Sequence, residues 1–353
     1  MTILATETRN LSAQNDLHLV MLPSNRQADL IRSQGLDRLG VPNALSRLGA
    51  RVAFLDVNAF PKNPLAKKPS LYASIDPWRA LRVLFTQRNA SVVISYYQSG
   101  VLVILALRHL LGFKPKVVII DIGDDIGWRM RARIVAFCVK RADAVFTFAR
   151  GQAEYLRDKY RIKNVHFLRQ QVDTRFFTPA AEEGDYLLAV GGDVSRDYAL
   201  LEEAVFPLGC KLVLKTHLRP RNPPAHVTIV DERISDAELR ALYRGAKAVL
   251  LPLKNMRHPG GITTLLEAFA CGKPVVASLS DGIKDYLNPG ENCLIVPCGD
   301  AGAFRSAVER LLADQALCLR LGQAARQYAE AELSQDRHAA RLMETLKWLT
   351  CQG

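Results

Sequence analysis

The chain has 353 residues, of which 49% are hydrophobic and 23% charged, and its formal net charge is +12 at pH 7. This length and composition exclude a single small module and a disordered chain, and they predict two domains of comparable size. The longest unbroken aliphatic run, Val101 to Leu107, is far shorter than the roughly 20 residues that cross a bilayer. The N-terminus lacks the basic start and apolar stretch of a signal peptide, so we expect a cytoplasmic protein.

Positive charge is unevenly distributed along the chain. Residues 1–172 hold 26 Lys and Arg against 12 Asp and Glu, whereas residues 173–353 hold 21 against 23. The asymmetry suggests that the first half faces an anionic partner, although a solvated basic face would give the same pattern. We do not expect nucleic acid, because no nucleic-acid-binding motif accompanies the charge. The seven cysteines include no Cys-x-x-Cys pair, so we expect reduced thiols and no metal site.

The first half alternates short β-branched runs with longer stretches of helical period. Helices are predicted at residues 36–48 and 126–140, and a surface loop at residues 60–77, where prolines are frequent. Strand followed by helix, repeated, is typical of a parallel sheet covered on both faces. The predicted strands are residues 17–22, 52–57, 91–96, 117–121 and 144–148.

The same pattern begins again after residues 171–185, a polar segment without a period that we expect to join two domains. The sequence therefore predicts an α/β protein with two doubly wound parallel sheets, in residues 1–171 and 172–333. Residues 334–353 are expected to form a C-terminal helix that packs back toward the first domain. Predicted strands are residues 186–190, 211–215, 227–230, 248–253, 274–277 and 294–296, and predicted helices are residues 195–206, 236–244, 264–270 and 301–313.

Residues 258–278 carry the clearest chemical signal. They follow a hydrophobic strand, place two glycines and two threonines at a helix start, and lead into another strand. Free N–H groups and the positive end of the helix dipole converge at such a turn, which favours a phosphate site. Glu267 lies one turn further on, where its carboxylate can accept hydrogen bonds from sugar hydroxyls. The alternative is a capping box from Thr264 to Glu267, which would satisfy the helix's own N–H groups and bind no ligand.

Several segments resemble the nucleotide-sugar-binding domain of glycosyltransferase family 4 and its relatives with GT-B architecture. They occur in the family's order and span residues 172–300, whereas the glycine-rich acceptor-side loop of the family is weak in the first half. Residues 172–179 resemble the segment that opens this domain, and residues 191–198 its first donor-side loop. The remaining matching segments are residues 260–277, 281–286, 290–297 and 299–300.

The resemblance implies two Rossmann-like domains that face across a cleft, with the nucleotide sugar held mainly by the C-terminal domain and the acceptor by the N-terminal one. It implies a hexosyltransferase of class EC 2.4 that retains anomeric configuration, uses a UDP- or GDP-linked sugar and requires no metal or other cofactor. Glu267 matches the family's ribose-binding glutamate, and Arg196 matches the basic residue that neutralises the diphosphate. The turn whose amides approach the phosphates corresponds to Gly260, Gly261, Ile262, Thr263 and Thr264.

One position departs from the family. Many members carry an acidic residue eight positions before the ribose-binding glutamate, near the transferred sugar, and this position is Pro259 here. A subset of the family with a similar turn also lacks this acidic residue. The departure therefore does not argue against sugar transfer, but it leaves the identity of the transferred sugar undetermined. It motivates the alternative function, a catalytically silent subunit of the same fold that binds a partner transferase or a glycan.

Cations near the diphosphate would stabilise the leaving group during sugar transfer. Arg196 is the first candidate for this catalytic role. Lys254 and Arg257 precede the glycine turn, and Lys215 ends its predicted strand, so these three are further candidates for the phosphates. Each could instead be an exposed surface charge, which is the usual state of Lys and Arg.

The sequence gives fewer candidate residues for contact with the acceptor. Asp121 follows a predicted strand and could contact an acceptor hydroxyl or act as base, or it could be a helix N-cap. His258 is a candidate donor to the sugar or phosphate, although a lone histidine can be purely structural. Basic residues in 62–88 and 129–141 suggest a peripheral attachment to an anionic membrane surface, with a glycan or lipid-linked acceptor.

Overall fold

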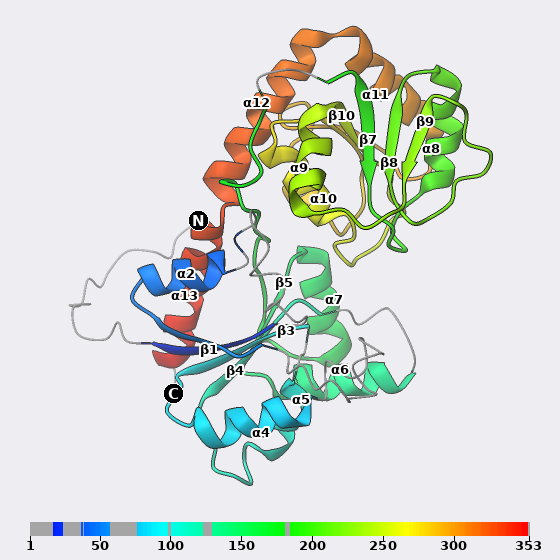
Figure 1. The fold of residues 1–353 in the computed structure, drawn as a ribbon. Helices are drawn as coiled ribbons and strands as arrows, with labels where there is room; N and C mark the ends of the chain where they lie inside the picture. The colour runs from blue at the N-terminus through cyan, green and yellow to red at the C-terminus, as the bar shows by residue number, and fades with distance from the viewer. Residues whose placement is uncertain are drawn as a thin grey trace, which may run out of the picture.

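The computed structural model describes residues 17–23, 37, 39–56, 76–97, 100–122, 129–180 and 184–351. The loop predicted at residues 60–77 lies almost entirely outside these ranges, as do most of residues 22–40, where the glycine-rich acceptor-side loop of the family would lie. Within the described part of the chain, two six-stranded sheets form, and all their strand pairs are parallel. The predicted fold class, two doubly wound α/β units, is confirmed (Figure 1).

The N-terminal sheet has the strand order β2-β1-β3-β4-β5-β6. Its strands are β1 (His18–Leu22), β2 (Arg51–Phe54), β3 (Val92–Tyr96), β4 (Lys116–Ile120), β5 (Ala144–Thr147) and β6 (Val165–Phe167). Buried side chains alternate between the two faces, so that the sheet has a core on each side. The helices are α2 (Gly40–Arg47), α4 (Pro77–Thr86), α5 (Val101–Leu107), α6 (Arg129–Arg141) and α7 (Arg150–Tyr160).

The C-terminal sheet has the strand order β12-β11-β10-β7-β8-β9. Its strands are β7 (Tyr186–Val190), β8 (Leu212–Lys215), β9 (Val227–Val230), β10 (Ala246–Leu251), β11 (Val275–Ser278) and β12 (Leu294–Val296). The α-helices are α8 (Tyr198–Val205), α9 (Asp236–Gly245), α10 (Ile262–Ala270), α11 (Ala301–Ala313), α12 (Gln315–Glu332) and α13 (Gln335–Cys351), and two short 3-10 helices are η2 (Phe206–Leu208) and η3 (Lys284–Tyr286). No helix in the described ranges is long and apolar enough to cross a bilayer.

Some predicted boundaries were wrong for local reasons. The helix expected from residue 195 begins only at Tyr198, because Asp197 is its N-cap and accepts a hydrogen bond from the Leu200 N–H. The strand expected at residues 248–253 is β10, which begins and ends two residues earlier. The helices α4, α5, α7 and α12 and the strand β6 were not predicted; β6 has only three residues, too few for a period to be visible.

The chain connects the two domains twice, and the two crossings lie side by side. The backbone N–H of Val172 donates to the carbonyl of Leu333 at 2.8 Å, between α12 and α13. The Arg326 guanidinium on α12 donates to the carbonyls of Phe177 and Ala270, at 2.8 and 2.6 Å. After this crossing, α13 runs along the N-terminal domain and packs against α2 (Figure 1).

Candidate functional site

Two adjoining hollows lie between the domains. One has a volume of about 240 Å³ and the other about 300 Å³, and Gln170 and Thr263 line both. The smaller hollow lies between Asp121, which follows β4, and the turn before α10. The larger hollow is lined by Glu267 and by side chains of the N-terminal domain such as Tyr96. Both lie beyond the carboxyl ends of strands, where open α/β sheets bind their ligands.

The turn before α10 is built around two glycines. Gly261 is the N-cap of α10 with φ of 83°, and no side chain caps this helix end. A Cβ atom at Gly261 would lie 2.5 Å from Arg196 Nη1, and one at Gly260 would lie 2.3 Å from Ser195 Oγ. Only glycine therefore allows the turn to pass so close to the loop before α8. Residues 260–263 all line the smaller hollow. The Ile262 N–H donates to the Pro259 carbonyl at 3.2 Å, and the N–H groups of Gly261 and Thr263 lie beside this open space.

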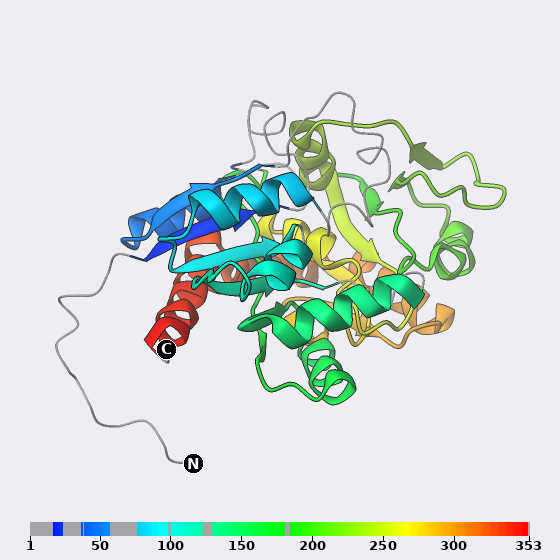
Figure 2. The ribbon, with the colours of Figure 1, turned by 90° about the horizontal axis from the view of Figure 1, so that it is seen from below.

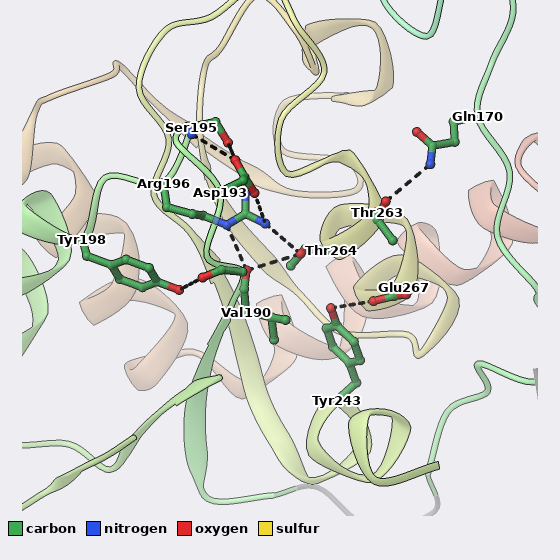
Figure 3. A network of polar contacts seen from close by, with 11 residues as sticks. Gln170, Val190, Asp193, Ser195, Arg196, Tyr198, Tyr243, Thr263, Thr264 and Glu267 are labelled. Atoms are coloured by element: carbon green, nitrogen blue, oxygen red, sulfur yellow. Dashed lines mark hydrogen bonds and ion pairs between the residues drawn. The ribbon is translucent and has the colours of Figure 1, made fainter. Parts of the chain in front are cut away.

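The capping box considered from sequence is wrong. Thr264 lies inside α10, because the helix already begins at Ile262. The Thr264 hydroxyl accepts a hydrogen bond from Arg196 Nη2 at 3.0 Å and donates to the Val190 carbonyl at 3.3 Å. The Glu267 carboxylate accepts a hydrogen bond from the Tyr243 hydroxyl at 2.9 Å (Figure 3). Burial and the adjacent Glu267 carboxylate raise the pKa of Tyr243, so this hydroxyl stays protonated and holds the carboxylate in place.

Arg196 is buried directly beneath the glycine turn. Its side chain is only 4% exposed, and its Nε donates to the Val190 carbonyl at 3.0 Å (Figure 3). The third guanidinium nitrogen, Nη1, is buried without a hydrogen-bond partner in the described structure. A buried, unpaired donor on a cation costs free energy, and an anion at the glycine turn would remove that cost.

Asp193 partly neutralises this arginine. One of its carboxylate oxygens lies 3.6 Å from Arg196 Nη2, and the other accepts hydrogen bonds from the backbone N–H and hydroxyl of Ser195. Burial acts to raise the pKa of Asp193, but the Arg196 guanidinium and the Ser195 donors outweigh it and hold the pKa below its ordinary value. Asp193 therefore stays ionised and fixes the guanidinium beside α10.

Tyr97 and Asp121 form the opposite wall of the smaller hollow. They follow the neighbouring strands β3 and β4, and both have left-handed backbones, with φ of 52° and 62°. The buried Asp121 carboxylate accepts hydrogen bonds from the Tyr97 hydroxyl and from the Ile122 N–H. Burial raises the pKa of Asp121, while the hydrogen bonds and the nearby His258 of the other domain act in the opposite direction. Left-handed backbones at two adjacent strand ends are typical of functional sites.

Three of the predicted cations lie elsewhere. Among the described residues, neither hollow is lined by Lys215, Lys254 or Arg257. Lys254 is exposed, and Lys215 is half-buried at the end of β8. The Arg257 guanidinium lies over the Tyr155 ring of the N-terminal domain, 4.7 Å from its centroid. These positions leave Arg196 as the predicted cation that lines the space in front of α10.

Sequence reasoning missed Gln170, Tyr97 and Tyr243. Gln170 Nε2 donates to the Thr263 hydroxyl at 3.4 Å, and its amide oxygen is buried without a partner in the described structure (Figure 3). Only the domain arrangement brings Gln170, which follows β6, to the start of α10. In the described ranges, no group of three or more His, Cys, Asp or Glu side chains is placed to hold a metal ion.

Comparison with known sequences gives a family match within the C-terminal domain. Residues 211–328 match the family described as "Glycosyl transferases group 1". A D-inositol 3-phosphate glycosyltransferase from Salinispora arenicola is 29% identical over 250 aligned residues, which cover 58% of this chain and 55% of that protein. The lipopolysaccharide core biosynthesis glycosyltransferase LpsE of Rhizobium meliloti is 36% identical over 72 residues, 20% of this chain and 21% of the relative. The chain thus matches from a fifth to about half the length of these relatives.

Solved structures share the fold over nearly the whole chain. Sucrose-phosphate synthase from Thermosynechococcus elongatus superposes with a TM-score of 0.74 and 18% identity, covering 95% of this chain and 100% of that one. Anabaena HepE in complex with UDP gives a TM-score of 0.68 with 14% identity, covering 94% and 100%. The predicted GT-B architecture and the resemblance to glycosyltransferases are therefore confirmed.

Proposed function

We propose that this chain, which carries a group 1 glycosyltransferase domain, is an enzyme that moves a sugar from a nucleotide diphosphate sugar to an acceptor. One observation carries the proposal: the uncapped glycine turn of α10 lies against the buried, unpaired Arg196 Nη1, and Glu267 follows one turn later. A diphosphate at the turn would receive backbone N–H groups, the helix dipole and a guanidinium together. The ribose hydroxyls would then reach the Glu267 carboxylate.

The leaving diphosphate gains negative charge as the glycosidic bond breaks. In the proposed mechanism, the Arg196 guanidinium and the N–H groups of Gly261, Thr263 and Thr264 stabilise this charge without a metal ion. The guanidinium is already fixed by Asp193 and by the Val190 carbonyl, so it needs little reorganisation during the reaction. We propose that anomeric configuration is retained, in keeping with the resemblance found in the sequence.

The acceptor would approach from the N-terminal domain. Asp121 and His258 line the same hollow as the glycine turn, one from each domain. We assign Asp121 to contact the acceptor hydroxyl and His258 to donate a hydrogen bond to the sugar or a phosphate oxygen. Pro259, which replaces the acidic residue of many relatives, also lines this hollow and would leave the transferred sugar with one polar contact fewer.

We propose a UDP- or GDP-linked donor, and HepE, a protein with the same fold, has been crystallised with UDP and with UDP-glucose. A glycan, a glycolipid or another lipid-linked molecule is the acceptor class we favour. The proposed setting is the cytoplasmic side of a membrane, with peripheral attachment through the basic N-terminal domain.

A thermal-shift series with UDP-, GDP-, ADP- and dTDP-sugars tests this proposal. We expect one nucleotide class to raise the unfolding midpoint, because ligand binding to the folded state stabilises it by mass action. The Glu267→Gln variant should lose most of this shift, since an amide accepts fewer hydrogen bonds from the ribose than a carboxylate does.

The matched control is Tyr243→Phe, which removes the hydrogen bond between Tyr243 and Glu267 but keeps the Glu267 carboxylate. It should retain a larger shift than Glu267→Gln. Hydrolysis of the stabilising donor, followed by chromatography of the released nucleotide, separates an enzyme from a silent subunit. Binding without any turnover would favour the silent subunit, and no stabilisation by any nucleotide at millimolar concentration would overturn both the site and the reaction.

A further inference from the structure

Two helices on one face of the N-terminal domain, α4 and α5, contain no Asp or Glu. The core on this side of the sheet contains residues of α4, α5, α6 and α7, of which α7 carries Glu154 and Asp158, whereas α2 and α13 pack on the opposite side (Figures 1 and 2). The helix α6 also contains no Asp or Glu; α4 has two arginines, and α6 has four arginines and one lysine. Residues 77–116 as a whole contain six Lys and Arg and no acidic residue. Of these six, Arg79 pairs with Asp76 and Arg108 with Asp143, whereas Arg82, Arg88 and Lys114 are exposed and form no ion pair with the described carboxylates.

Large apolar side chains stand exposed on the same face. Trp78 and Phe85 of α4 are 64% and 62% exposed, and Leu110, just after α5, is 82% exposed. Trp78, Arg82 and Phe85 follow the i, i+4, i+7 spacing that places side chains on one side of a helix. The opposite side of α4 is buried, with Ala80, Val83 and Leu84 in the core. The exposed aromatic rings are therefore not required for packing within the domain.

Two contacts tie α4 to the segment that carries Leu110. Arg88, just after α4, donates from Nη2 to the carbonyls of Leu111 and Gly112, at 2.8 and 3.3 Å. This pair of hydrogen bonds ties the end of α4 to the segment that contains Leu110. The helices α4 and α5 also pack directly against each other. We call Trp78, Arg82, Phe85, Leu110 and Lys114 the basic apolar face.

We propose that the basic apolar face docks on an anionic lipid bilayer, with Trp78, Phe85 and Leu110 at headgroup depth. Exposed aromatic and aliphatic side chains among cations, without carboxylates, match the chemistry of an interface whose phosphates are negative and whose interior is apolar. The C-terminal half of the chain, with 21 Lys and Arg against 23 Asp and Glu, has no such excess. Charge complementarity thus favours an anionic lipid surface as the partner, and it places the contact on this side of the molecule.

The inference deepens the proposed peripheral attachment and does not depend on sugar transfer. What membrane docking implies for the acceptor does rest on the proposed function. The Arg79 guanidinium, near the start of α4, donates to the carbonyl of Pro23, which follows β1 at the carboxyl edge of the sheet. Trp78 therefore lies at the edge of the sheet that borders the hollows. A docked molecule would present its acceptor side close to the lipid headgroups.

Sedimentation with vesicles tests the docking surface. The full chain is mixed with vesicles of phosphatidylcholine alone or with 30% phosphatidylglycerol, and the bound fraction is measured at low and high salt. We expect strong binding only with phosphatidylglycerol, weakened by salt. Trp78→Ser with Phe85→Ser should reduce the partition coefficient about tenfold or more, and Arg82→Gln with Lys114→Gln should reduce it about thirtyfold at low salt.

Matched controls come from the C-terminal domain. Leu319 is 48% exposed on α12, and the Arg219 side chain is 87% exposed, so Leu319→Ser with Arg219→Gln removes similar groups from another surface. This variant should bind vesicles as the unmodified chain does. The nucleotide-induced thermal shift of every variant reports separately on folding and on the proposed donor site.

A fluorescence measurement keeps Trp78 in place. The chain has three tryptophans, so Trp128→Phe with Trp348→Phe leaves Trp78 as the sole emitter. Anionic vesicles should shift its emission to shorter wavelength, because the indole leaves water. Equal binding to both lipid mixtures, unchanged binding of the Trp78 and Phe85 variant, or an unshifted Trp78 emission would each overturn the proposal. Self-association that depends on Trp78 and Phe85, without vesicle binding, would instead assign this face to a second copy of the chain.

Discussion

At the scale of single residues, the site depends on how closely the backbone of the turn approaches Arg196. The guanidinium is held from three directions, by the Val190 carbonyl, the Thr264 hydroxyl and the Asp193 carboxylate. Its remaining nitrogen lies against Gly261, where no side chain intervenes. A cation fixed in this way can stabilise a phosphate without first losing side-chain freedom, which is the usual entropic cost of a surface arginine.

Substitution of Gly261 by Ala tests this approach. The new Cβ atom would lie 2.5 Å from Arg196 Nη1 and 3.0 Å from a Leu253 methyl group, and the left-handed backbone adds a cost of roughly 1–2 kcal/mol. We expect lower stability in chemical denaturation and loss of the nucleotide-induced thermal shift.

The control is Gly209→Ala, where φ is 66° and no atom lies within 4 Å of the new Cβ. Its free energy of unfolding should fall only by the cost of the left-handed backbone, and it should keep the full nucleotide-induced thermal shift. If both variants respond equally to nucleotide, the close approach of Gly261 to Arg196 has no role in binding.

At the scale of elements, α13 joins the C-terminal end of the chain to the N-terminal sheet. His338 lies near its start, is only 2% exposed and contacts the Arg169 carbonyl through Nδ1 at 2.7 Å. Because a carbonyl only accepts, Nδ1 carries the proton and donates it. The imidazole also lies beside the Phe148 ring, with centroids 6.4 Å apart. Burial lowers the pKa of His338 to about 4, so the folded chain keeps this ring neutral.

The lowered pKa predicts a pH-dependent stability. The unfolded His338 takes up a proton below about pH 6.5, whereas the folded one does so only near pH 4, so the free energy of unfolding falls across this window. The loss should reach about 3 kcal/mol by pH 4. Urea denaturation between pH 7 and pH 4 measures it.

His338→Asn is the matched variant, since its amide can still donate to the Arg169 carbonyl but does not titrate. Carboxylates titrate equally in both proteins, so the difference between the two pH profiles isolates the imidazole. Parallel profiles would contradict the neutral, buried state of His338.

At the scale of the whole molecule, the two domains are held by contacts beyond the two chain crossings. The Tyr286 hydroxyl, from η3 of the C-terminal domain, donates to the Phe148 carbonyl at 2.8 Å and accepts from the Gln170 N–H at 2.9 Å. Asp285 beside it accepts from the Arg150 N–H at 2.8 Å. These contacts lie next to the hollows, since Gln170 lines both of them. They fix the relative orientation of the two walls of the candidate site.

Removal of the Tyr286 hydroxyl should loosen this junction. Tyr286→Phe leaves the Phe148 carbonyl and the Gln170 N–H without their partner, which costs about 1–3 kcal/mol per buried group. We expect a lower unfolding midpoint and a weaker nucleotide-induced shift, because Gln170 is no longer held against Thr263.

Tyr186→Phe provides the comparison, since its hydroxyl donates to the Leu242 carbonyl within the C-terminal domain. It should destabilise the protein without weakening the response to nucleotide. A full nucleotide response in Tyr286→Phe would show that the junction does not position the site.

Local sequence patterns were enough to predict the alternation of strands and helices, the parallel sheets and the glycine turn before α10, because these depend on local period and backbone freedom. The sequence also pointed to Arg196, Glu267, Asp121 and His258, which all line the hollows. Only the tertiary structure decided that Lys215, Lys254 and Arg257 lie elsewhere, and that Thr264 binds Arg196 instead of capping its helix. It also brought Gln170 and Tyr97 to the site. Those outcomes depend on how distant segments dock, and no short-range pattern in the chain records that arrangement.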